Sequence, residues 1–208
     1  FYLQLCDNVR RFKGLTEQVR KPAKATINVN GDMAQWNNVT SIYKAVSSNS
    51  IARSSTSVDR KIKYNISAAR NNVQQVKIAN DANTIYFLVQ AQSNMQSVDS
   101  ADFVNIYFGV GNLELKGWNG YEFVISCGDK ALYALDASGK REKIADVEVA
   151  VKGNSAVASV DMSLIKANDQ EGIYFKVTDG VTSTDIMDTY VDGKCMPMGR
   201  LSYYYYFG

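Results

Sequence analysis

The sequence predicts an all-β fold, a two-layer antiparallel β-sandwich of the jelly-roll or immunoglobulin-like type with a short N-terminal helix. About ten short β-prone segments follow one another, with Gly, Asn or Asp turn signals between them, as sandwiches require. Hydrophobic residues make up 46% of the 208 positions and charged residues 21%. A chain of that length and composition can bury one substantial core and is not of the disordered class.

The first 24 residues differ from the rest of the chain. FYLQLCDNVRRFKG (1–14) has helical spacing and ends at Gly14, whereas LTEQVRKPAK (15–24) is polar and contains a proline. The apolar residues on one face of the expected helix are Leu5, Val9 and Phe12. We expect residues 1–24 to be the terminal helix and linker of a preceding domain, and residues 25–208 to form the sandwich.

After residue 24 the hydrophobic period changes from helical to alternating. TIYFLVQA (84–91) is apolar on both faces, as expected of a central strand. KGNS (152–155) is a hairpin signal, MSLIKA (162–167) predicts a helical turn and SSNSIARSSTSVD (47–59) predicts a long polar loop. The expected strands are 25–31, 73–81, 84–91, 103–110, 121–126, 131–136, 146–151, 155–161, 173–179, 185–191 and 200–207.

Composition excludes several classes of function. The chain has no histidine and a net charge of +2, which disfavours the usual general base and gives no basic footprint for nucleic acid. No apolar run approaches the roughly 18 residues of a membrane span. The three cysteines lack metal-ligand spacing. A disulfide between Cys127 and Cys195 is one interpretation, and buried thiols are the favoured one. We expect neither metal nor cofactor.

Four blocks follow one another over residues 25–206: ATINVNGDMAQWNNV (25–39), YNISAARNNVQQVKIANDANTIYFLVQA (64–91), FVNIYFGVGNLELKGWNGYEFVI (103–125) and IYFKVTDGVTSTDIMDTYVDGKCMPMGRLSYYY (173–205). Their order resembles the DOMON-like, carbohydrate-binding-module-family-9-like β-sandwich domains. Similar domains follow glycoside-hydrolase-like barrels in bacteria. The resemblance therefore implies an accessory domain that is secreted, periplasmic or displayed at the cell surface.

Two departures from the family pattern bear on calcium. Family members carry acidic residues where this sequence has Phe108-Gly109-Val110-Gly111, and their Arg-Asn-Asp phrase is Arg70-Asn71-Asn72 here. Calcium prefers six to eight oxygen ligands, several of them carboxylates. Glu114 is a replacement ligand, but the balance favours no metal.

Five residues are candidates for carbohydrate binding. Trp118 and Tyr121, in the GWNGYEF phrase, offer rings for stacking on a sugar, and packing beneath their loop is the favoured alternative. Arg53, Arg70 and Asn72 offer hydrogen bonds to sugar hydroxyl groups. For Arg70, an ion pair with Asp185 or Asp188 at the sheet edge is the favoured alternative.

Other conspicuous residues are assigned structural roles. Asp185 and Asp188 would lie on opposite faces of a strand, which disfavours a glycosidase pair. Trp36 and Arg200 are expected to pack or to bond to loop carbonyl groups. The run Tyr203–Phe207 is expected to place one face in the core. For the other face, contact with a catalytic domain is favoured over a sugar platform or an ordinary sheet edge.

The leading hypothesis is a non-catalytic domain that binds a polysaccharide or oligosaccharide and supports a preceding catalytic domain in the same chain. The alternative is a purely structural domain that packs on a glycoside-hydrolase barrel and stabilises it. A standalone enzyme is disfavoured, because the sequence has no nucleophile elbow, no P-loop and no carboxylates on a shared face.

Overall fold

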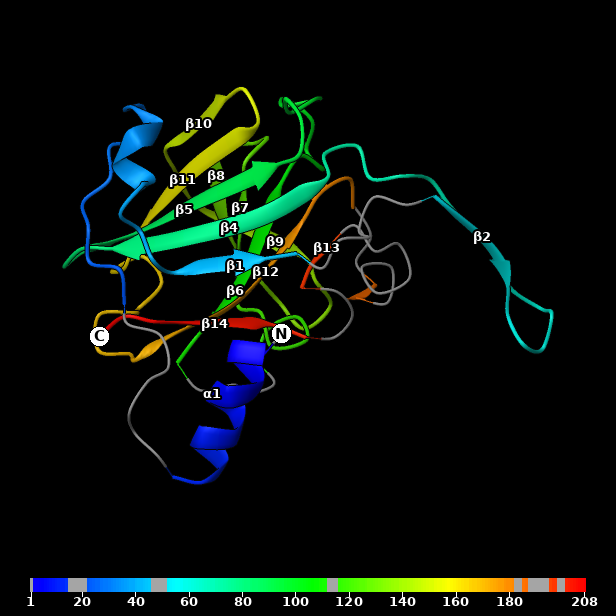
Figure 1. Cartoon of the computed structure of the whole chain (residues 1–208), viewed down its shortest axis with the longest axis horizontal. Helices are drawn as coiled ribbons and strands as arrows, with labels where there is room; N and C mark the ends of the chain where they lie inside the picture. Colours follow the sequence, from blue (N-terminus) through cyan, green and yellow to red (C-terminus); the bar gives the residue numbers. More distant parts are fainter. Residues whose placement is uncertain are drawn as a thin grey trace.

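The computed structural model describes residues 2–14, 22–45, 52–111, 116–181, 185–186, 195–197 and 201–208. Two antiparallel sheets pack face to face (Figure 1). The predicted all-β sandwich with a short N-terminal helix is therefore confirmed. Sheet A contains, in spatial order, β1 (Ile42–Lys44), β4 (Val73–Asn80), β5 (Thr84–Ala91), β11 (Ser155–Asp161) and β10 (Val149–Lys152).

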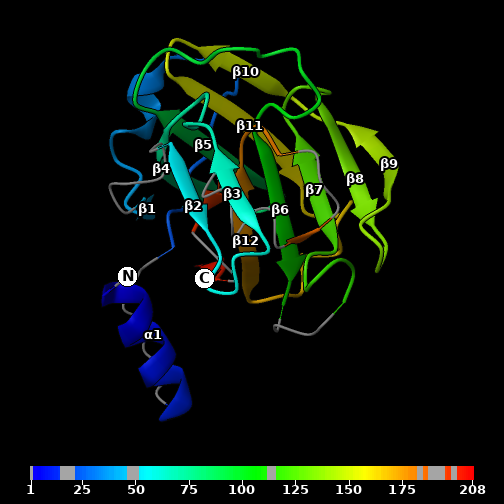
Figure 2. The ribbon, with the colours of Figure 1, turned by 90° about the vertical axis from the view of Figure 1, so that its right-hand side faces the viewer.

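Sheet C forms the opposite layer (Figure 2). Its strands, in order, are β13 (Cys195–Met196), β12 (Gly172–Thr178), β6 (Asn105–Val110), β7 (Phe123–Ser126), β8 (Ala131–Leu135) and β9 (Arg141–Asp146). A further strand, β14 (Tyr203–Tyr206), pairs with the first half of β12, while β13 pairs with its last two residues. The edge of β12 is thereby shared by two short strands.

The core lies between the inner faces of the two sheets. Sheet A contributes alternate residues such as Ile85, Phe87 and Val89, and sheet C contributes Phe108 and Phe175 among others, all fully buried or nearly so. Tyr203, Tyr205 and Phe207 also enter this core, as predicted for one face of the last strand. Apolar residues recur at every second position of these strands because alternate side chains point into the space between the two sheets and fill it.

The outer face of sheet A is covered by residues 22–39, which include the 3₁₀ helix η1 (Met33–Trp36). The expected strand 25–31 is wrong: only Lys24 forms an isolated bridge, with Asn80. The segment packs by side chains instead, and Trp36, 1% exposed, lies against Leu88 and Val157 in a second apolar cluster. This cover explains why TIYFLVQA is apolar on both faces.

Two lysines secure the covering segment. Lys77 Nζ donates to the Trp36 carbonyl at 2.9 Å. Lys152 Nζ donates to the carbonyl groups of Asn30 and Gly31 at 2.6 and 2.8 Å. Each lysine projects from the outer face of sheet A and bonds a carbonyl group of the segment above it.

A hairpin of β2 (Arg53–Thr56) and β3 (Lys63–Ile66) projects from the sandwich (Figures 1 and 2). The prediction of an irregular loop over 47–59 is therefore wrong for residues 53–56. The Ser57 amide bonds the Ile62 carbonyl at 2.8 Å, and Asp59 Oδ1 accepts from the Lys61 amide at 3.2 Å. These bonds close a turn that polar composition alone did not reveal.

Helix α1 (Tyr2–Phe12) lies outside the sandwich, below β14 in Figure 1. Gln4 Nε2 donates to the Ser202 carbonyl and so joins the helix to the chain that enters β14. Leu5, Val9 and Phe12 are 47%, 43% and 92% exposed. The apolar face expected from the helical spacing is thus open to solvent over these residues.

We predict that Trp36→Ala will lower the free energy of unfolding by about 4 kcal/mol, because it removes the largest side chain of the cover and leaves a cavity. Urea denaturation monitored by circular dichroism measures the change. The matched control is Val58→Ala at the fully exposed hairpin turn, which should shift stability by less than about 0.5 kcal/mol. Equal losses in the two variants would contradict the assigned role of the cover.

Candidate functional site

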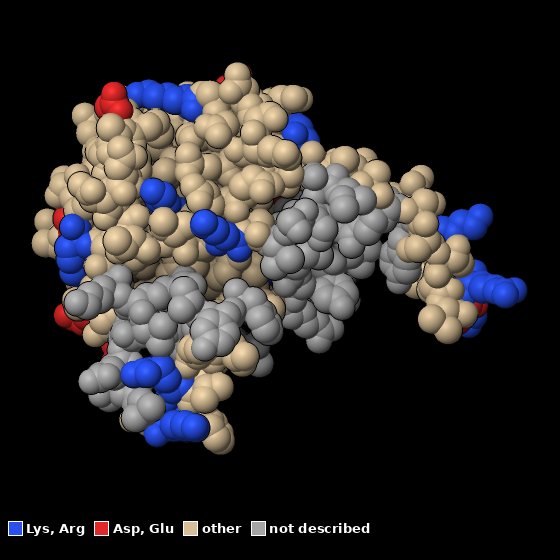
Figure 3. Space-filling view, in the orientation of Figure 1, with Lys and Arg blue, Asp and Glu red and all other residues tan. Residues whose placement is uncertain are grey.

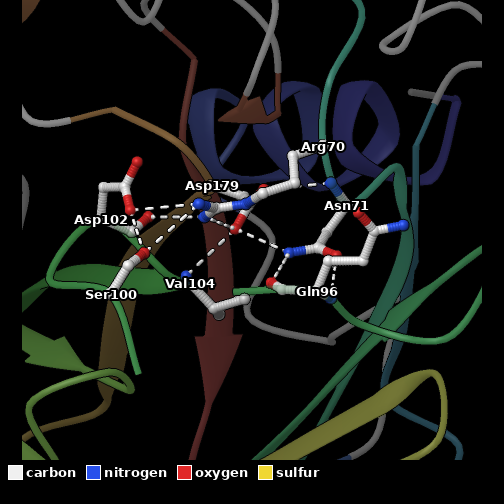
Figure 4. A network of polar contacts seen from close by, with 7 residues as sticks. All are labelled: Arg70, Asn71, Gln96, Ser100, Asp102, Val104 and Asp179. Atoms are coloured by element: carbon white, nitrogen blue, oxygen red, sulfur yellow. Dashed lines mark hydrogen bonds and ion pairs between the residues drawn. The ribbon is translucent and has the colours of Figure 1, made fainter. Parts of the chain in front are cut away.

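The carboxylate of Asp179, which directly follows β12, is 2% exposed and accepts four hydrogen bonds (Figure 4). Arg70 Nη2 lies 2.9 Å from its Oδ1, and Asn71 Nδ2 lies 3.1 Å from the same atom. The amides of Asn71 and Val104 donate to Oδ2 and Oδ1 at 3.2 and 3.3 Å. Such a set of donors is what a buried carboxylate requires.

The network joins three separate parts of the chain. Arg70 and Asn71 precede β4, Val104 precedes β6, and Asp179 follows β12. Asn71 also exchanges bonds with Gln96, since its Oδ1 accepts from the Gln96 amide at 2.8 Å and its Nδ2 donates to the Gln96 carbonyl at 3.1 Å. The loop after β5 is thereby fixed to the start of β4, its neighbour in sheet A.

The second carboxylate of the network is Asp102. Its Oδ1 lies 3.2 Å from Arg70 Nη1 and also accepts a bond from the Ser100 hydroxyl. The Ser100 bond, and then the Arg70 charge, lower the pKa of Asp102 against the opposing effect of burial. Burial by itself would lower the pKa of Arg70, but bonds and attraction from Asp179 and Asp102 raise it. Arg70 therefore stays charged between two carboxylates.

Beside the network lies an open hollow of about 300 Å³, referred to below as the amide hollow. Two of its lining residues are bonded to each other, since the Asn72 Nδ2 atom donates to Gln92 Oε1 at 2.8 Å. Asn72 Oδ1 and Arg70 Nε are buried atoms without a hydrogen-bond partner in the described part of the chain. Its lining consists of Ala68, Ala69, Arg70, Asn71, Asn72, Gln92, Ser93, Asn94 and Gln96.

Arg70 and Asn72, two of the five predicted carbohydrate-binding residues, therefore meet in one hollow. The favoured pairing of Arg70 with Asp185 is wrong, because its ion-pair partners are Asp102 and Asp179. Asp188, the other expected partner, lies outside the described residues. Strand β12 ends at Thr178. The residue immediately after it, Asp179, pairs with Arg70, whereas Asp185 comes later in the chain.

Trp118 and Tyr121 lie elsewhere, on the outer face of sheet C, and are 4% and 3% exposed. Trp118 packs against the Tyr107 ring at a centroid distance of 5.3 Å, and a Cβ on Gly139 would lie 2.9 Å from the indole. The Tyr121 hydroxyl bonds Ser202 Oγ at 2.7 Å. The rings are thus enclosed in a third apolar cluster and present almost no surface for stacking on a sugar.

The structure gives little information on the other residues that the sequence singled out. Only the backbone of Arg53, in β2, is described, and Arg200 and Glu114 lie outside the described residues. Among the residues that the structure describes, no three His, Cys, Asp or Glu side chains are grouped as for a metal ion. Cys127 and Cys195 are buried thiols that form no disulfide with each other, which is the favoured interpretation, and burial raises the pKa of Cys127 to about 12.

Sequence reasoning missed most of the amide hollow. The run QAQSNMQS (90–97) carries a high density of amide and hydroxyl groups at the end of a buried strand. This density is a sequence signal that could have indicated a polar site. The structure shows that Gln92, Ser93, Asn94 and Gln96 face the stretch Ala68–Asn72. Asp102 and Asp179 were missed because their partners are 32 and 109 positions away in sequence.

Comparison with known proteins gives little further guidance. No protein-family model matches the chain, and no curated protein matches it. One similar solved structure is a carbohydrate binding module family 9 from Caldicellulosiruptor kristjanssonii in complex with glucose. It is 15% identical, with a TM-score of 0.41, over 78% of this chain and 79% of that chain. In the described residues, no helix is long and apolar enough to span a membrane.

We predict that Asp179→Ala will lower the free energy of unfolding by about 3 kcal/mol, because it leaves Arg70 and several amide donors partly buried without their acceptor. Thermal or urea unfolding measures the loss. Asp169→Ala removes an exposed carboxylate from the turn before β12 and is the matched control. A loss no larger than that of the control would show that the network does not hold the loops together.

Acid should weaken the same region. The pKa of Asp102 is lower in the folded chain than in the unfolded chain. Its contribution to stability is therefore complete above about pH 4 and disappears as the pH falls through the folded-state pKa. Urea unfolding from about pH 7 down to about pH 2.5 should show a shallower acid loss for Asp102→Asn than for the unmodified chain. Parallel curves would refute this assignment.

Proposed function

We propose that this chain is a non-catalytic carbohydrate-binding domain, accessory to a secreted polysaccharide-active protein, and that the amide hollow holds the sugar. The observation that carries the proposal is the chemistry of the lining. Five carboxamide side chains surround the space, at Asn71, Asn72, Gln92, Asn94 and Gln96, and Ser93 adds a hydroxyl group. The Asn71 amide is occupied by Asp179 and Gln96, whereas the other four carboxamides both donate and accept, which is the pattern that sugar hydroxyl groups complement.

Two further features support a ligand in this place. The acceptor Asn72 Oδ1 is buried without a partner within the described structure, and a rotation of the side chain that brings it to a sugar hydroxyl group would remove the cost of burial. The Asp179 network fixes Asn71, and through it the backbone of Gln96, in the lining of the hollow. Walls that are already positioned lose little conformational entropy when a ligand binds.

The lining also favours binding over hydrolysis. Arg70 is the ionisable residue among the described groups that line the hollow, and both of its carboxylate partners point to the guanidinium group. Hydrolysis of a glycosidic bond needs two carboxyl groups that face each other across the substrate. The domain would act by proximity: a weak contact keeps an attached catalytic domain near its polysaccharide and raises the effective concentration.

One observation favours a second candidate, a structural domain that packs on a preceding barrel. Helix α1 exposes Leu5, Val9 and Phe12 at the spacing of one helical face. Such a face is typical of a helix that packs against another domain. In that case the amide hollow would bind no glycan, so a glycan titration distinguishes the two candidates.

We predict that Asn72→Ala and Gln92→Ala will each weaken binding of a neutral glycan about fivefold, the effect of losing one hydrogen bond of about 1 kcal/mol. Affinity electrophoresis on a panel of soluble polysaccharides, followed by calorimetry with the best ligand, measures the change. Gln170→Ala, at an exposed glutamine before β12, is the control and should bind as the unmodified chain does. Absence of binding across the panel, or equal binding by all variants, would contradict the proposal.

A further inference from the structure

A row of polar residues crosses the full width of sheet A. The strand registers pair Lys44 with Gln75, Gln75 with Gln90, Gln90 with Ser155, and Ser155 with Lys152. The row therefore takes one residue from each of β1, β4, β5, β11 and β10. Four inter-strand spacings of about 4.8 Å make it about 19 Å long. We call it the polar row.

The polar row lies on the outer face of the sheet. Val76 and Val89, the immediate neighbours of Gln75 and Gln90, are in the core between the sheets. Because successive side chains of a strand point to opposite faces, Gln75 and Gln90 point outward. Both are partly exposed, and Lys44 and Lys152 at the two ends are exposed. Residues 22–39 cover the neighbouring part of this face, up to the contacts of Lys77 and Lys152 with the covering segment.

The centre of the row is a chain of hydrogen bonds between uncharged groups. Gln75 Nε2 donates to Gln90 Oε1, and Gln90 Nε2 donates to Ser155 Oγ at 3.2 Å. Ser155 Oγ in turn donates to Asn154 Oδ1 at 3.1 Å. Each amide is oriented by its neighbour, and Gln75 Oε1 has no bond to any described group. The row therefore offers fixed donors and acceptors rather than freely rotating side chains.

The row is continuous with the amide hollow. Gln90 lies in β5, and Gln92 follows the end of that strand, where its amide bonds the Asn72 carbonyl at 2.8 Å and its side chain accepts from Asn72 Nδ2. The Asn72–Gln92 bond of the hollow thus runs beside the Gln75–Gln90 bond of the row. In Figure 3 uncharged residues predominate over the part of the face that β4, β5 and β11 occupy. A ligand leaving the hollow meets the uncharged pair Gln75 and Gln90 first, with Lys44 and Lys152 at the two ends of the row.

We infer that the polar row extends the amide hollow and binds the internal units of a neutral glycan chain lying across the strands of sheet A. This inference rests on the proposed function and specifies its ligand: a chain of several sugar units rather than a single sugar or a chain end. A neutral chain is the matching occupant because the partly exposed Gln75 and Gln90, on neighbouring strands, present uncharged carboxamide groups, while Ser155 is buried beside them and orients Gln90.

The test measures affinity against chain length. Calorimetry uses the full chain and neutral cello-, xylo-, laminari- and manno-oligosaccharides from the disaccharide to the hexasaccharide. The hexasaccharide of the preferred series should bind about fivefold more tightly than its disaccharide, as one added hydrogen bond would give. Gln90→Ala should abolish that gain and leave the disaccharide affinity unchanged, whereas Gln170→Ala should retain the gain.

The outcomes separate the inference from the function on which it rests. Equal affinity for the disaccharide and the hexasaccharide would overturn the inference that the polar row binds glycan. It would leave the proposal of glycan binding in the amide hollow unchanged. Absence of binding by any oligosaccharide would overturn both. An anionic hexasaccharide, an oligogalacturonate, is the control: tighter binding of it than of every neutral hexasaccharide, lost between about 0.05 and 0.5 M NaCl, would show that Lys44 and Lys152 attract an anionic chain and would overturn the neutral-chain inference.

A second readout avoids substitutions, which protects the test against a misfolded variant. The side-chain NH₂ groups of Gln75, Gln90, Asn72 and Gln92 give separate signals in a ¹H–¹⁵N spectrum. A disaccharide should shift the Asn72 and Gln92 signals, and a hexasaccharide should shift those of Gln75 and Gln90 as well. Shifts confined to the hollow with both ligands would contradict the inference.

Discussion

The buried carboxylate of Asp179 is the constraint from which the geometry of the candidate site follows. It is 2% exposed, and a charge in that position requires a matched cation and several donors. Arg70, Asn71 and the Val104 amide supply them. Satisfying one carboxylate therefore holds the start of β4, the loop before β6 and the end of β12 together. The walls of the amide hollow are a consequence of that arrangement.

The same network explains an unusual backbone conformation. Val104 has φ of 25°, which is rare for a β-branched residue, and its side chain is fully buried. Its amide donates to Asp179 Oδ1, and its carbonyl accepts from the Cys127 amide at 3.0 Å. Bonds on both sides of the residue offset the strain. The Val104 amide, at the junction between the loop and β6, is thereby held in position to donate to Asp179.

Both outer faces of the sandwich carry apolar clusters, which limits where a ligand can bind. Residues 22–39 cover part of sheet A, and the loop with Trp118 and Tyr121 packs on sheet C. The side chains of Trp36, Trp118 and Tyr121 are buried in these clusters. What sheet A leaves partly exposed near the start of β4 is a neutral polar surface, so the site depends on hydrogen bonds and is expected to bind weakly.

The sandwich was predictable because its alternating strands are local in sequence, and Gly, Asn and Asp mark the turns between them. The prediction erred where packing overrides pattern: residues 25–31 look like a strand but cover a sheet, and residues 53–56 look like loop but pair in a hairpin. Arg70 and Asn72 were identified as candidates, yet the partners of Arg70 were not. Its ion pair with Asp179 spans 109 positions, and no local pattern encodes such a contact.

A crystal structure of the chain soaked with a neutral hexasaccharide tests the central claim most directly. The account predicts a sugar unit in the amide hollow, with a hydroxyl group within hydrogen-bonding distance of Asn72 Oδ1, while Arg70 and Asp179 remain paired. A sugar bound against Trp118 or Tyr121 on sheet C, with the amide hollow filled by water, would contradict it.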